Sequence, residues 1–127
     1  MKANNLGKRI IVIGDVHGEY EKFRTILSDA KLVDSSINWI GSDTILVQTG
    51  DMIDRGPKSI ESVGLIRSLQ EQAHRVGGTV VRLLGNHELE LLKERCLDPN
   101  LPSQNQLSEV IRKEIVQGKV CAAWTDV

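Results

Sequence analysis

The sequence predicts an α/β protein built on a largely parallel sheet. Three short apolar runs each stop at a glycine, and each is followed by a loop and then by apolar residues at helical spacing. Strands that alternate with helices are typical of a parallel sheet with helices packed on it. The composition fits one globular domain, because 40% of the 127 residues are hydrophobic and 26% are charged.

The three predicted strands cover residues 10–13, 44–49 and 79–84, and a glycine follows each directly. We expect the first to be buried on both faces, because all four of its residues are apolar. A helix from Glu19 should bury a stripe of apolar residues, namely Tyr20, Phe23, Ile26, Leu27 and Ala30. A second helix from Pro57 should bury Ile60, Val63, Ile66, Leu69, Ala73 and Val76.

Further elements are expected in the C-terminal third of the chain. A third helix is predicted over residues 88–96, with Leu89, Leu92 and Cys96 as its apolar stripe. Ser103 and Gln106 have the spacing of a capping box for a helix that extends to Gln117. Residues 120–124 are predicted to begin another strand.

The charge and the cysteine content exclude several classes of function. The net charge is −1, so no basic surface for nucleic acid or for a membrane is expected. The N-terminus lacks the apolar run of a secretory signal, and no stretch approaches the roughly 20 residues of a membrane span. Cys96 and Cys121 are expected to be buried thiols in a reducing compartment. We therefore predict a cytoplasmic protein.

Polar side chains gather in the loops that follow the three strands. The loops supply Asp15 and His17, then Asp51, Asp54 and Arg55, then Asn86 and His87. A single Gly-Asp after a strand is usually a turn or a helix cap. Three such loops in succession are different, because the carboxyl ends of parallel strands meet at one edge, where ligands bind.

Carboxylates and imidazoles without any thiolate favour ions such as Mn, Fe or Zn. Asp15 and His17 are two residues apart and can face one ion from an extended loop. Asp51 can bridge two ions, and Asn86 offers a neutral oxygen to the second. Two divalent ions held in this way bind a phosphate and activate a water.

Three further side chains suit the chemistry of phosphate esters. Arg55 can hold phosphate oxygens in a bidentate manner. His87 can protonate the leaving alcohol if a carboxylate orients it, and Asp54 is the nearest candidate. The predicted enzyme is therefore a metal-dependent phosphoesterase.

The loops resemble the phosphoprotein-phosphatase branch of the calcineurin-like metallophosphoesterases, whose pattern runs G-D-x-H-G, G-D-x-x-D-R-G and G-N-H-E. All three motifs match without a substitution, and the resemblance covers about residues 8 to 97. Residues 46–51, 54–57, 72–78 and 84–88 resemble the Shewanella-like phosphatases most closely.

The resemblance implies a role for each motif residue. Asp15, His17 and Asp51 would bind the first metal, and Asp51 and Asn86 the second. His87 paired with Asp54 would be the general acid, and Arg55, with Asn86, would contact the substrate phosphate. The expected substrate is a phosphoprotein or a small phosphoester, and manganese is one expected metal.

The sequence departs from the family pattern after His87. The family completes its second metal site with two histidines from later loops and adds another substrate arginine, but no histidine follows His87 here. The family fold is also a sandwich of two sheets flanked by helices. We therefore expect residues 1–127 to be the N-terminal half of one catalytic domain, inactive alone, which self-associates or binds the missing half through exposed apolar faces.

Three other functions are alternatives to a protein phosphatase. A hydrolase of dinucleoside polyphosphates shares these motifs and the Arg-Gly-Pro-x-Ser run at residues 55–59, although Asp54 and Glu88 favour the phosphoprotein branch. A nucleotide-binding domain would need a Walker loop, but Gly56 is followed by Pro57. A catalytically incompetent half-domain that acts as a binding or regulatory fragment is the remaining alternative.

Overall fold

The computed structural model describes residues 7–92, which form three strand–loop–helix units. The elements in chain order are β1 (Ile10–Ile13), α1 (Tyr20–Asp29), β2 (Ile45–Gln48), α2 (Ser59–Arg75), β3 (Thr79–Arg82) and α3 (Asn86–Leu91). The strands form a sheet in the order β1-β2-β3, and both pairs are parallel. The predicted α/β class is confirmed.

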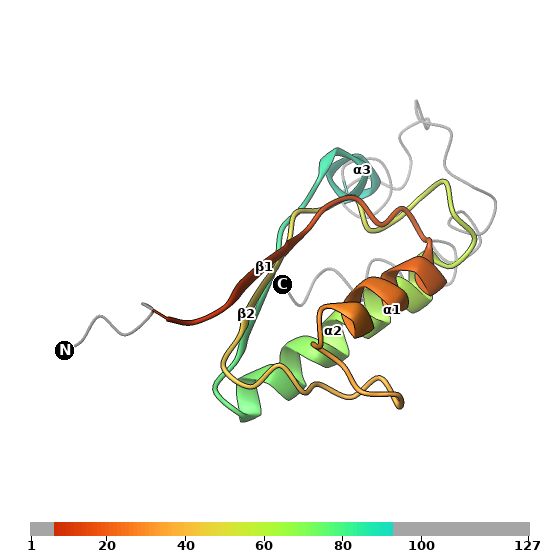
Figure 1. Ribbon diagram of the computed structural model, residues 1–127. Coiled ribbons are helices and arrows are strands. Elements are labelled where there is room, and N and C mark those ends of the chain that lie inside the picture. Colours follow the sequence, from red (N-terminus) through yellow and green to blue (C-terminus); the bar gives the residue numbers. More distant parts are fainter. Residues whose placement is uncertain (1–6, 93–127) are drawn as a thin grey trace.

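The strands are aligned in register, and this alignment positions the loops that follow them. Ile10 pairs with Ile45, which pairs with Thr79, and the last residues of the three strands are partners in the same way. All three strands therefore end at one edge of the sheet, where α3 also lies (Figure 1). β2 and β3 are each two residues shorter than predicted, because pairing stops where the loops diverge.

Helices α1 and α2 cover the same face of the sheet (Figure 1). Their inward side chains pack with the sheet residues that point toward them, in a core that includes Phe23, Leu27, Leu46, Val63, Ile66, Leu69 and Val80. Two residues of the predicted stripes are exposed instead, namely Ile26 and Val76. Ile26 lies on an exposed side of α1, and Val76 follows the last residue of α2.

The expectation that β1 is buried on both faces is wrong for the part of the chain that the structure describes. Ile10 and Val12 are 59% and 62% exposed, whereas Ile13 is buried. Side chains alternate between the two faces of a strand, and the helices cover one face only. The open face also carries Val47 and Val81, which are half-buried.

Two predicted helices begin at other residues than expected. α2 begins at Ser59 rather than Pro57, because the backbone N–H of Lys58 donates to the Gly18 carbonyl at 3.0 Å before the helix starts. α3 begins at Asn86, and its buried residues are Glu88 and Leu91, while the predicted Leu89 is 56% exposed. The inward turn of Glu88 decides which face of α3 is buried.

Some predictions fall outside the described residues: the end of the third helix, the helix at 103–117, the strand at 120–124 and both cysteines. Within residues 7–92, none of the helices has both the length and the apolar character needed to span a membrane.

Candidate metal centre

The loops after the three strands are joined by backbone hydrogen bonds. The N–H groups of Val16 and His17 both donate to the Asp51 carbonyl, at 3.0 and 2.9 Å. The N–H of Gly18 donates to the Met52 carbonyl at 2.8 Å, and that of Gly56 to the His17 carbonyl at 2.7 Å. The first two loops therefore form one backbone unit that fixes the relative positions of their side chains.

Glycines permit this close approach. A Cβ at Gly18 would lie 2.8 Å from the Gly56 carbonyl oxygen, and one at Gly85 would overlap the Asp51 carboxylate. Gly50, at φ +103°, also has a conformation that L side chains rarely adopt, and a Cβ there would overlap the Gly85 backbone. The third loop can therefore contact the second only because both carry glycine.

Backbone strain is concentrated at the predicted site residues. Seven non-glycine residues of the described chain have positive φ, and four of them are His17, Asp51, Asp54 and Arg55, at +47°, +54°, +72° and +73°. Left-handed backbone is uncommon for such residues and persists where the surroundings enforce it.

Three of the predicted residues form a compact group of potential metal ligands. One donor atom each from His17, Asp51 and His87 lies within 4.8 Å of the others. The two imidazole rings meet edge to face, with centroids 4.7 Å apart and an interplanar angle of 76°. The sequence predicts an acid-catalytic role for His87, whereas the structure also places its ring nitrogen close enough to His17 and Asp51 for the three to share an ion.

His17 is oriented by a backbone carbonyl. Its Nδ1 lies 3.0 Å from the Ile53 oxygen, which can only accept, so Nδ1 carries the proton in this hydrogen bond. The other ring nitrogen, Nε2, lies 3.4 Å from Asp15 Oδ2. Metal-binding histidines commonly donate their other N–H to a carbonyl in this way. Asp15 is 60% exposed and lies outside the group of three.

Asn86 contacts the Asp51 carboxylate. With its amide nitrogen turned toward Asp51, it donates to Oδ2 at 2.9 Å and to Oδ1 at 3.3 Å. The opposite orientation would place an amide oxygen at the same position, and only a cation would stabilise three oxygens so close together. The backbone N–H of His87 also donates to Asp51 Oδ1, at 3.0 Å. Asp51, which is 9% exposed, thus joins the second and third loops.

Asp54 and His87 form the pair that the sequence predicted. Asp54 Oδ2 lies 3.3 Å from His87 Nδ1, and Asp54 is 5% exposed. The backbone N–H of Asp54 donates to Ser59 Oγ at 3.0 Å, and Asp54 Oδ1 accepts the N–H of Arg55 at 3.0 Å. Arg55 itself is exposed.

Two buried polar residues that support the site were not identified from the sequence. Gln48 donates to the carbonyls of Gly14 and Gly50, at 3.2 and 2.7 Å, and so connects the ends of β1 and β2. Glu88 is fully buried and accepts backbone N–H groups from the second and third loops. Gln48 could have been noticed in the sequence, because it is a polar residue at the end of an apolar strand.

Burial raises the pKa of the Glu88 carboxyl, and three backbone N–H groups and one neighbouring charge modify that shift. Backbone N–H donors at Gly85, Asp51 and Ile53 lower the pKa, whereas the charge of the Asp51 carboxylate raises it. Burying a carboxyl group is unfavourable unless hydrogen bonds compensate it. The position of Glu88 therefore depends on those backbone donors.

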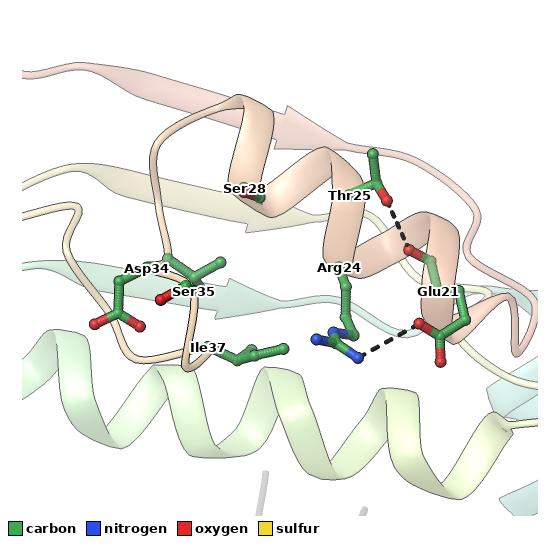
Figure 2. Close-up of a pocket in the computed structure, with 8 residues that line it drawn as sticks. Glu21, Arg24, Thr25, Ser28, Asp34, Ser35 and Ile37 are labelled. Carbon is green, nitrogen blue, oxygen red and sulfur yellow. Dashed lines mark hydrogen bonds and ion pairs between the residues drawn. The ribbon is translucent and has the colours of Figure 1, made fainter.

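Two surface hollows lie on either side of α1. One, of about 280 Å³, adjoins the candidate centre and is lined by Ile13, Asp15, Val16, His17, Glu19, Lys22, Phe23 and Ile26. The other, of about 270 Å³, lies between α1 and the segment of residues 33–37 (Figure 2). The second contains none of the motif residues, and its Arg24 is paired with Glu21 at 3.4 Å. Of these two hollows, the first contains motif residues, namely Asp15 and His17.

The donor set suits divalent transition ions. Two imidazoles and a carboxylate lie together, and an amide and a second carboxylate adjoin them among the residues that the structure describes. The residues present therefore fit a metal centre, and a carboxylate-oriented imidazole beside an arginine suits hydrolysis of a phosphate ester.

Comparison with known proteins gives the class of this site. The sequence profile of the calcineurin-like phosphoesterases matches residues 8–120. The chain belongs to this family of metal-dependent phosphoesterases, as the motifs predicted.

Particular relatives agree with the predicted branch. The chain is 40% identical over 82 residues to Shewanella-like protein phosphatase 2 of Arabidopsis thaliana, covering 65% of this chain and 21% of that protein. It is 40% identical over 80 residues to Shewanella-like protein phosphatase 1 of Plasmodium berghei, covering 63% and 22%. The crystal structure of a cold-active protein-tyrosine phosphatase from a psychrophilic Shewanella species superposes with a TM-score of 0.70 at 31% identity, covering 90% and 31%.

A second set of similar proteins is named as dinucleoside tetraphosphatases. The symmetrical bis(5′-nucleosyl)-tetraphosphatase of Proteus mirabilis is 36% identical over 81 residues, which cover 64% of this chain and 24% of that enzyme. The chain thus spans about a fifth to a quarter of the curated relatives described here.

Proposed function

We propose that this protein is a phosphomonoester hydrolase that acts on phosphoproteins through two divalent metal ions. The observation that carries the proposal is the meeting of three strand-end loops, which brings His17, Asp51 and His87 within 4.8 Å. The Asp54–His87 pair adjoins this group and adds a proton donor.

We assign the first ion to Asp15, His17 and Asp51, and the second to Asp51 and Asn86. Bound together, the ions would polarise the phosphate and lower the pKa of a water that attacks it. Manganese, iron and zinc all suit this donor set, and manganese is our first choice for testing.

The remaining steps fall to side chains of the chain itself. Arg55, exposed at the edge of the second loop, binds the phosphate oxygens and offsets the charge that develops on them. Asp54 holds His87 through Nδ1, so that Nε2 can donate a proton to the departing alkoxide. The left-handed backbone at Asp54 and Arg55 directs the two side chains in different directions.

Cleavage of dinucleoside tetraphosphates is a second candidate function, because relatives with that name are also similar. One sequence feature that favours this function is the Arg-Gly-Pro-x-Ser run. In the structure the run has a supporting role that either function would require. Ser59 accepts the Asp54 N–H and so supports the Asp54–His87 pair. The run therefore does not distinguish the two substrates.

The assay that tests the proposal uses one panel of substrates with this chain as part of a complete catalytic domain, in excess Mn²⁺. Phosphotyrosine, phosphoserine and phosphothreonine peptides would be compared with a dinucleoside tetraphosphate. Release of phosphate from peptides, abolished by His17→Ala and kept by His74→Ala on the exposed surface of α2, supports the proposal. Turnover of the tetraphosphate alone would assign the second function instead.

We also propose that the open face of the sheet is a contact surface within a larger catalytic domain. Ile10 and Val12 are exposed there beside the half-buried Val47 and Val81. Such a contiguous apolar surface favours association. We propose that it binds the second half of the domain or, without it, another copy of the chain. Light scattering of the purified chain tests this, since a concentration-independent monomer would contradict self-association. A cytoplasmic location remains a prediction.

A further inference from the structure

We propose that Glu88 is a positioning residue that holds the Asp51 carboxylate at the metal centre. The inference rests on the proposed function, because it assigns to Glu88 an effect on the affinity of the site for metal. Glu88 is not one of the three potential ligands, and its hydrogen bond to Asp51 is made to the backbone N–H and not to the carboxylate. It acts on the backbone that carries one of them.

The contacts of Glu88 connect two loops. Oε1 accepts the N–H of Asp51 at 2.5 Å and the N–H of Gly85 at 2.8 Å. Oε2 accepts the N–H groups of Met52 and Ile53, at 2.9 and 3.4 Å. One fully buried carboxylate thus binds three successive residues of the second loop and the residue that precedes α3.

Helix capping alone does not explain this arrangement. A glutamate at the third position of a helix commonly accepts the N–H of the capping residue, and the Gly85 contact is of this kind. The other three donors, however, belong to a loop more than 30 residues earlier in the chain. Those contacts serve the second loop rather than the helix.

The second loop needs such a partner because of its backbone conformation. Asp51 has φ +54°, so its N–H and those of the next two residues point inward together. Buried donors without acceptors would be strongly unfavourable. Glu88 satisfies them, and Asp51 can then direct its side chain toward His17 and His87.

The same carboxylate also sets the distance between ligands of different loops. Because Oε1 accepts from both Asp51 and Gly85, the two backbones meet at a single atom. Asn86 and His87 follow Gly85 directly, and both contact the Asp51 carboxylate. Displacing Glu88 should therefore separate Asp51 from Asn86 and His87 together.

Glutamine is the discriminating substitution. Glu88→Gln keeps the size of the side chain and one acceptor oxygen, but its NH₂ group would face two of the four donors. Glu90→Gln is the matched control, because Glu90 lies on the same helix and is only half-buried. The two variants undergo the same chemical change on the same helix, but only Glu88 is fully buried and bonded to the second loop.

Two measurements on the full 127-residue chain test the proposal. Amide hydrogen exchange, followed by NMR without metal, should accelerate about tenfold or more in Glu88→Gln at two or more of the four amides of Asp51, Met52, Ile53 and Gly85, because the NH₂ group leaves one pair of donors without an acceptor. Amides of α2 should be unchanged. Titration with Mn²⁺ should show affinity reduced by about 10- to 100-fold, the usual effect of losing a residue that orients a ligand. Glu90→Gln should match the wild type in both.

The outcomes separate this proposal from the proposed function. Unchanged exchange at the four amides, or unchanged Mn²⁺ affinity in Glu88→Gln beside a wild type that binds Mn²⁺, overturns the positioning role. A wild type that binds no Mn²⁺ contradicts the proposed metal centre and also this proposal, even if the amides are loosened. Uniformly faster exchange, including α2, would identify Glu88 as a residue of general stability and would likewise overturn it.

Discussion

Nδ1 of His87 lies 3.3 Å from Oδ2 of Asp54, while the ring of the same histidine packs edge to face against His17. Asp54 occupies one ring nitrogen, so only Nε2 is left for another partner. That atom can donate a proton to a leaving group or bind an ion, but it cannot do both at once. The distinction between these roles leads to the first prediction.

In the complete catalytic domain, substitution of His87 by alanine should lower turnover of alkyl phosphates by about 10²- to 10⁴-fold, because the leaving group loses its proton donor. The deficit should shrink for nitrophenyl phosphate, whose leaving group is acidic. Mn²⁺ affinity should stay within about tenfold of the wild type, because we assign His87 to proton donation and not to metal binding. Loss of Mn²⁺ binding together with equal deficits for both substrates would make His87 a ligand.

In the complete catalytic domain, Arg55→Ala should lower kcat by about 10²-fold and also raise KM, because the phosphate loses a charged partner in both the bound and the transition state. Arg55→Lys should recover only part of this, since lysine keeps the charge but not the bidentate geometry. Steady-state kinetics on nitrophenyl phosphate measures both effects. A variant with an unchanged KM would show that Arg55 does not bind the substrate.

Removal of individual metal ligands should abolish the stabilisation that metal provides. A ligand that binds only the folded state raises its stability, so Mn²⁺ should raise the melting temperature of the wild type. His17→Ala and Asp51→Asn should remove that rise, and Asp15→Asn should reduce it. His74→Ala, on the exposed side of α2, is the control and should retain it in full. Differential scanning fluorimetry with and without Mn²⁺ decides the matter.

Gly85→Ala should impair the centre through backbone contact alone. A Cβ at this position would overlap the Asp51 carboxylate and backbone, so the second and third loops must separate. We expect destabilisation of about 1–3 kcal/mol, the usual cost of overpacking, together with weaker Mn²⁺ binding. Gly64→Ala is the control: nothing lies near its Cβ in α2, and it should stabilise the protein by up to about 1 kcal/mol. Equal melting temperatures for the two variants would refute the close-contact argument.

The 127-residue chain alone should be nearly inactive as a phosphatase. Among the residues that the structure describes, our proposal assigns only Asp51 and Asn86 to a second ion, and it shares Asp51 with the first. Two protein ligands are too few to hold an ion in competition with water. Without the second ion, the charge on the attacking and leaving oxygens is not stabilised. The chain and a Shewanella-like phosphatase of full length would be assayed side by side with nitrophenyl phosphate and excess Mn²⁺. Comparable turnover would mean that the site is completed in another way, for instance across a dimer.

The sequence by itself determined the fold class, the order of the elements and the identity of the motif residues. Runs such as Ile10–Ile13 and the stripe through Phe23 and Leu27 carry a local periodicity, which short-range sterics and solvent exposure convert into strands and helices. The glycine after each strand likewise marked the loops that meet at one edge of the sheet.

Only the tertiary structure decided which loop residues touch and which faces are buried. Ile10 and Val12 are exposed because burial depends on what covers a strand, and no local pattern records that. In the sequence, Glu88 is only the last residue of a motif. In the structure, three of its hydrogen-bond donors lie in a loop more than 30 residues earlier. The grouping of His87 with His17 and Asp51 likewise depends on strand register and on the close contact of Gly85 with Asp51. Contacts between residues distant in the chain are set by packing, which acts only once the elements have assembled.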